Sequence, residues 1–147
     1  MTVKLAAALV AGLAMVAAAQ ASRADTSFDK LPKVESLPKG VVQVSPFVPG
    51  MGEHWANPAT LPLGPIYCVM NGRVVCMEYM IAQKDFVAGK SFEKLVPWFA
   101  GTEQPPIDHM EFNFEPNGHE GFTVPHFDVH MYFVSPGVRM TTKAAMK

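Results

Sequence analysis

The sequence predicts a mainly β or α+β domain, folded as a single antiparallel sheet or half-barrel with one short helix. Two segments, 107–115 and 125–134, alternate polar and apolar residues, as strands with one buried face do. Within 65–82, an apolar run is interrupted by Asn71-Gly72, the pair favoured by a two-residue type I′ hairpin turn. Two hairpins that flank one helical segment fit an open sheet or a half-barrel.

The chain has 147 residues, and residues 1–21 have the features of a secretory signal peptide. Lys4 gives a positive start, a short apolar run follows, and Ala19-Gln20-Ala21 is a small-x-small cleavage site. A cut after Ala24 is the alternative. No later segment has the ~20 continuous apolar residues of a membrane-spanning helix. We therefore expect a soluble periplasmic or secreted protein without a membrane anchor.

The mature chain is expected to have three parts: an extended arm (22–44), one antiparallel β-rich domain (45–135) and a solvated tail (136–147). Inside the domain, residues 49–65 are rich in proline and glycine, which favours an irregular loop. The short helix is expected within 91–99, where Ser91 would cap its N-terminus.

The charge distribution favours a partner that is a cation. The net charge of −1 indicates neither a nucleic acid nor an anionic membrane surface as a partner. Between Leu95 and Val138 there is no lysine or arginine, although the stretch carries acidic side chains and four of the five histidines. The acidic residues of this stretch are Glu103, Asp108, Glu111, Glu115, Glu120 and Asp128.

The two cysteines, Cys68 and Cys76, leave two interpretations open. An exported protein favours a disulfide. A two-residue turn at Asn71-Gly72 would direct the two side chains to opposite faces, whereas a bulge or a three-residue loop would place them opposite one another. The alternative is a pair of small buried thiols.

The polar faces of the two alternating segments predict a metal site. If both apolar faces are buried on the same side, His109 lies opposite His130 and Glu111 lies opposite Asp128 in one natural register. Opposed Cβ atoms are ~5 Å apart, which suits a first-row metal with ligand bonds of ~2.0–2.2 Å. His126 shares this face, but it is ~13 Å from His130 along the strand, so one ion cannot readily use both.

Other polar residues are expected around this set. His54 follows Gly50 and Gly52 in the proline- and glycine-rich segment, and a loop there could fold over the site and add His54 as a ligand. His119 is expected at the rim, and Glu78 on the first hairpin is expected to be exposed. Two other interpretations remain for the polar faces: an ordinary solvated side of a sheet, or a buried hydrogen-bonded network without metal.

Three segments, MGEHW, PIYCVMNGRVVCMEYM and PHFDVHMYFV, together resemble a family of uncharacterised exported bacterial proteins. This family was first described under the control of an extracytoplasmic stress sigma factor. The resemblance covers about residues 45–135 and implies export and a single domain, but no reaction. The histidine-bearing strands are also similar in arrangement to cupins and α-type carbonic anhydrases. Asp128 stands where their His-x-His pair has its second histidine.

These observations predict a periplasmic metal-binding protein with His109, Asp128 and His130 as ligands. Further candidate ligands are Glu111, His54 and His126. Nitrogen and oxygen ligands suit Zn, Cu, Mn, Fe or Ni. An open coordination position would make a small metal-dependent hydrolase or hydratase, with Glu111 or Glu53 as proton acceptor. The alternative is a non-catalytic envelope-stress or ligand-binding protein that binds a small molecule or forms a homo-oligomer.

Overall fold

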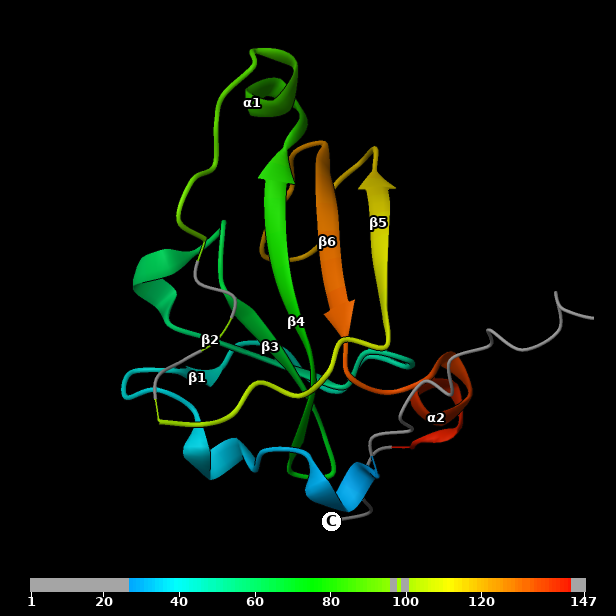
Figure 1. Ribbon diagram of the computed structural model, residues 1–147. Coiled ribbons are helices and arrows are strands. Elements are labelled where there is room, and N and C mark those ends of the chain that lie inside the picture. Colours follow the sequence, from blue (N-terminus) through cyan, green and yellow to red (C-terminus); the bar gives the residue numbers. More distant parts are fainter. Residues whose placement is uncertain (1–26, 96–97, 99–100, 144–147) are drawn as a thin grey trace, which may run out of the picture.

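The computed structural model describes residues 27–95, 98 and 101–143. Its centre is one open six-stranded antiparallel sheet with the strand order β1-β2-β3-β4-β6-β5 (Figure 1). The strands are β1 (Val42–Gln43), β2 (Glu53–Ala56), β3 (Ile66–Met70), β4 (Arg73–Ala82), β5 (His109–Glu115) and β6 (His126–Tyr132). The predicted mainly β fold is confirmed, and of the two predicted alternatives, a single antiparallel sheet and a half-barrel, the structure has the single open sheet. The predicted signal peptide, residues 1–21, lies outside the described residues, as does the alternative cut after residue 24.

The helices differ from those expected. The described chain has two short α-helices, α1 (Gln83–Val87) and α2 (Pro136–Thr141), together with the 3₁₀ turns Phe28–Lys30, Val34–Ser36 and Pro58–Thr60. Residues 91–95 of the expected helical segment are not helical, and most of its remainder lies outside the described residues. Helix α2 begins at the residue where a solvated tail was expected, because Ser135 caps its N-terminus by accepting from the N–H of Val138.

The first hairpin confirms the turn at Asn71-Gly72, where both residues have positive φ (48° and 74°). Strand β4 contains an extra residue: Cys68 pairs with Cys76, whereas the next residue, Val69, pairs with Val74. This bulge puts the two cysteines directly opposite one another, with Cα atoms 4.9 Å apart, and they form a disulfide. The sequence had left this pairing open because a bulge leaves no unique sequence pattern.

The segment expected to be an irregular loop contains strand β2, which pairs with β3 and brings His54 opposite Cys68. Gly52 permits this approach, since a Cβ atom there would lie 2.3 Å from the carbonyl oxygen of Val69. His54 is therefore fixed by a sheet ladder and is not carried by a mobile flap.

The main core lies on the face of the sheet that bears Tyr67, Met77 and Tyr79, and Trp98 and Phe133 pack against it. Among the described residues, no helix is long and apolar enough to cross a membrane.

The two alternating strands bury the face opposite to the one expected. On β6 the residues His126, Asp128, His130 and Tyr132 are buried, whereas the apolar residues between them are only half-buried. On β5, Met110 and Phe112 are 59% and 55% exposed. The prediction that the apolar face of this hairpin is buried in the core is therefore wrong. The alternative interpretation, that the polar face is exposed to solvent, is also wrong for β6, because its polar side chains are buried.

Candidate metal centre

Strand β6 aligns the polar side chains of three strands. Glu78 and Met80 of β4 lie opposite His130 and Asp128 of β6. On the other side, β5 is shifted by two residues from the expected register, so that His109 lies opposite Tyr132 and Glu111 lies opposite His130. The polar residues of β5 and β6 share one face of the sheet, as predicted, but Glu111 does not lie opposite Asp128.

One group of side chains, which we name the outer cluster, consists of His119, His126 and Asp128. The Nε2 atoms of His119 and His126 are 3.0 Å apart. The Nε2 atom of His126 is 3.0 Å from Oδ1 of Asp128, and that of His119 is 3.6 Å from its Oδ2. These separations suit ligands that surround a single ion at ~2.0–2.2 Å. Three side chains with metal-binding chemistry therefore converge in this part of the structure.

The hydrogen bonds of the outer cluster determine which nitrogens carry protons. The Nδ1 atom of His126 lies 2.6 Å from the carbonyl oxygen of Val124, and that of His119 lies 2.9 Å from the carbonyl oxygen of Glu120. A carbonyl oxygen only accepts, so both Nδ1 atoms donate, and both neutral rings present a bare Nε2 atom. Two facing lone pairs beside a carboxylate require a cation, either a proton or a metal ion, between them.

A tight turn positions His119. Gly118 has φ +63°, and a Cβ atom there would lie 2.5 Å from the carbonyl oxygen of Phe122. The backbone of His119 forms an isolated β-bridge with Phe122. The ring centroid of Phe122 lies 4.6 Å from that of His126. His119, expected at the rim, therefore reaches the buried Asp128 although its side chain is 41% exposed. Flanking glycines were the only sequence signal for this role.

A second group, which we name the inner cluster, consists of His54, Glu78 and His130. The Nε2 atom of His54 is 3.9 Å from Oε2 of Glu78, and that of His130 is 3.7 Å from its Oε1. Glu78 is only 3% exposed, so the expectation that it is exposed is wrong. In addition to the effect of burial, its carboxyl group is close enough to Asp128 for that neighbour to raise the pKa of Glu78, and the two clusters are therefore adjacent.

Burial governs protonation in these clusters. Burial, followed by the proximity of Asp128, raises the pKa of Glu78 to about 8. Burial is also the main cause that lowers the pKa values of His54 and His130 to about 4, and it raises the pKa of Asp128. At neutral pH the two imidazoles of the inner cluster are therefore neutral, which is the form that binds metals.

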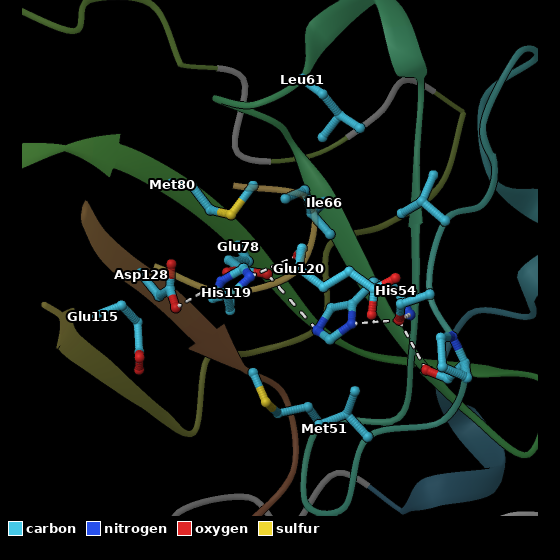
Figure 2. Close-up of a pocket in the computed structure, with 15 residues that line it drawn as sticks. Met51, His54, Leu61, Ile66, Glu78, Met80, Glu115, His119, Glu120 and Asp128 are labelled. Carbon is cyan, nitrogen blue, oxygen red and sulfur yellow. Dashed lines mark hydrogen bonds and ion pairs between the residues drawn. The ribbon is translucent and has the colours of Figure 1, made fainter. Parts of the chain in front are cut away.

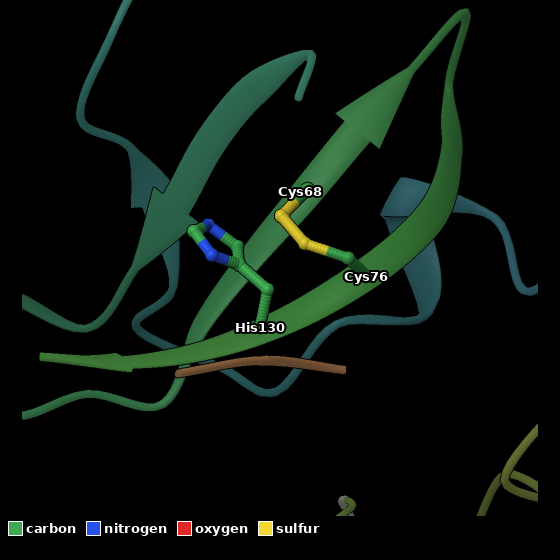
Figure 3. Close-up of side chains that lie close together, drawn as sticks. All are labelled: Cys68, Cys76 and His130. Atoms are coloured by element: carbon green, nitrogen blue, oxygen red, sulfur yellow. A yellow bond between two sulfur atoms is a disulfide. The ribbon is translucent and has the colours of Figure 1, made fainter. Parts of the chain in front are cut away.

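The disulfide adjoins the inner cluster. Figure 3 shows the ring of His130 beside Cys68 and Cys76, and one ligand atom from each residue lies within 4.8 Å of the others. Because the two sulfurs are bonded to one another, they are not thiolates, which are the form of cysteine that ligates metals. In this oxidised state, His130 alone supplies a ligand there.

The remaining predicted site residues lie elsewhere. His109 contacts Asp108 at 2.7 Å and stacks on Tyr132 with ring centroids 4.8 Å apart. Glu111 forms an ion pair with Arg139 of α2. Glu53 accepts from the indole of Trp55 and, because side chains alternate along β2, it points to the face opposite to His54. The structure thus brings together His54, Asp128 and His130, and places His109, Glu111 and Glu53 in other contacts.

A cavity of about 630 Å³ opens onto both clusters. Figure 2 shows His54 linked to Glu78, and His119 linked to Asp128, within it. The remaining labelled residues of its wall are Met51, Leu61, Ile66, Met80, Glu115 and Glu120. Its volume lies in the range of sites that hold small molecules, and its wall is mainly apolar.

Comparisons with known proteins bear on the fold alone. No family model and no curated protein matches the chain. Among solved structures, the crystal structure of the hypothetical protein TTHB210 from Thermus thermophilus is similar, with a TM-score of 0.56 and 23% identity. The match covers 73% of this chain and 96% of that one. The chain therefore shares its fold with a protein that is described only as hypothetical.

Proposed function

We propose that this chain is a periplasmic metal-binding protein whose outer cluster holds one divalent first-row ion. The observation that carries the proposal is the pair of bare Nε2 atoms of His119 and His126, which face one another 3.0 Å apart beside Asp128. Two imidazoles and a carboxylate suit Zn, Cu, Mn, Fe or Ni, and the affinity order favours Cu or Zn.

Export is part of this proposal. The signal-peptide features of residues 1–21 and the disulfide between Cys68 and Cys76 both suit an oxidising compartment. Membership of the exported stress-related family that the sequence resembles remains a prediction, as does a homo-oligomer. Cell fractionation of the natural host tests export, and sedimentation of the mature chain tests the homo-oligomer.

The cavity supports a hydrolase or hydratase as the catalytic form of this proposal. An ion on three protein ligands keeps a position for water, whose pKa a metal can lower to about 7. His119 and Asp128 line the cavity, so a small apolar molecule there would adjoin that water. Glu115 and Glu120 line it too, unlike Glu53 and Glu111, and they are the carboxylates placed to accept a proton.

The rival function is a non-catalytic ligand-binding or stress protein in which a proton replaces the metal. The contact between His119 and His126 equally suits an imidazole that donates to a second imidazole, and Asp128 would balance the added charge. Metal content distinguishes the two functions, because a proton-linked network binds no ion.

We expect the untagged mature protein to retain zinc after desalting, and His126→Gln to lose this ion because only an amide remains at that position. Elemental analysis of both proteins provides the measurement. His109→Gln is the matched control, since His109 lies on the same face but pairs with Asp108. Equal zinc in the wild type and His126→Gln, or none in either, would refute the proposal.

A further inference from the structure

We propose that the inner cluster binds a second divalent first-row cation, held by His54, Glu78 and His130. This site shares no ligand with the outer cluster, so it goes beyond the proposed function and can exist without it. With both ions bound, the adjacent Glu78 and Asp128 would make the sheet face a two-ion centre.

In the inner cluster, two imidazoles approach the same carboxylate. The Nε2 atoms of His54 and His130 approach different oxygens of Glu78, at 3.9 and 3.7 Å. Both separations are too long for hydrogen bonds. An ion with bonds of ~2.0–2.2 Å fits between either nitrogen and its nearest carboxylate oxygen at such distances, and a turn of the two rings toward one another would let one ion contact both nitrogens. The three side chains come from β2, β4 and β6, so the sheet ladder fixes their mutual positions.

The hydrogen bonds of His54 leave its Nε2 atom free to bind a cation. Ser45 Oγ lies 2.8 Å from the carbonyl oxygen of Pro46, to which its hydroxyl donates. The same Oγ lies 2.7 Å from Nδ1 of His54, so it accepts from that ring nitrogen. The Nε2 atom of His54 therefore carries the lone pair, and it is the atom that faces Glu78.

His130 provides an independent indication of a ligand. Its side chain is 3% exposed, and neither of its ring nitrogens has a hydrogen-bond partner among the described residues. A buried polar group left without a partner costs about 1–3 kcal/mol. A cation coordinated by Nε2 would remove part of this cost, whereas a plain core position would be filled as well by leucine or phenylalanine.

The surroundings favour a cation that reaches the cluster from solvent. No lysine or arginine pairs with Glu78 in the described structure, and Arg139, the basic residue nearby, is paired with Glu111 and stacked on Tyr132. His54 and Glu78 line the larger cavity, and His130 lines a smaller one of about 200 Å³. An ion can therefore enter without unfolding the sheet.

The test is the number of ions bound per chain. We expect the untagged mature protein, dialysed against zinc alone, to bind two ions by elemental analysis and calorimetric titration. His130→Gln and His54→Gln should each bind one ion. His54 is the less buried of the two histidines, so His54→Gln still tests the proposal if His130→Gln fails to fold. His109→Gln should still bind two ions.

The variants of the two clusters show separately whether each site binds an ion. If His119→Gln loses one ion and the two inner-cluster variants lose the other, both sites are present. If only the inner-cluster variants lose an ion, the outer site fails and the inner site stands. A wild-type protein whose bound zinc is unchanged in both His54→Gln and His130→Gln would overturn the inner site, whatever His119→Gln shows.

Discussion

Zinc at a thousandfold excess over the dissociation constant of the outer cluster is expected to raise the free energy of unfolding by about 4 kcal/mol through that site. The physical reason is that the three ligands of the outer cluster come from β6 and the turn before it, and they converge only in the folded chain. Urea denaturation with and without zinc, with the disulfide intact, measures this increment.

Asp128→Asn should remove most of this increment while preserving the shape of the side chain. A loss of at least a hundredfold in affinity would leave about 1.4 kcal/mol or less at the same zinc concentration. Asp108→Asn is the matched control, because Asp108 contacts His109 away from both clusters. An increment that survives Asp128→Asn unchanged would mean that the stabilising ion lies elsewhere.

In metal-free protein, the free energy of unfolding should fall by about 2 kcal/mol between pH 6.5 and 8, at about 1.4 kcal/mol per unit. Glu78 has a pKa of about 8 in the folded state, against 4.5 as its ordinary value. Between these values the folded chain keeps a proton that the unfolded chain releases, so raising the pH favours unfolding. Denaturation at several pH values in the presence of a chelator measures the fall.

The histidines of the inner cluster affect the free energy of unfolding in a different pH range. Their pKa values, lowered from 6.5 to about 4, make the folded chain bind fewer protons than the unfolded chain, so stability rises with pH between about 4 and 6.5. Above pH 6.5 this contribution is constant. Glu78→Gln should therefore flatten the profile between pH 6.5 and 8, whereas Glu120→Gln, which alters an exposed side chain of the same cavity, should keep the fall. A fall that persists in Glu78→Gln would show that another group causes it.

The strands were predictable because they follow from local patterns. Alternation located β5 and β6, and Asn71-Gly72 located the first hairpin. The buried side of β6 was not predictable in this way. Alternation separates two faces, but which face is covered depends on segments outside the two strands, here β2, whose His54 approaches Glu78, and the turn whose His119 approaches Asp128.

The types of residue in the candidate site were predictable from the sequence, but only some of the individual residues were. His54, Asp128 and His130 were identified because they lie on strand faces or beside glycines. Glu78 was missed because a single glutamate in a strand has the same pattern whether it is buried or exposed. The shift that separates Glu111 from Asp128 arises from the length of the turn between β5 and β6, which the sequence leaves undetermined.

The most direct measurement is a crystal structure of the mature protein soaked in zinc, with anomalous scattering recorded on both sides of the zinc absorption edge. We expect an anomalous peak within ~2.2 Å of the Nε2 atoms of His119 and His126 and of a carboxylate oxygen of Asp128. A map from a zinc-saturated crystal with no peak among these three side chains would contradict the proposed function.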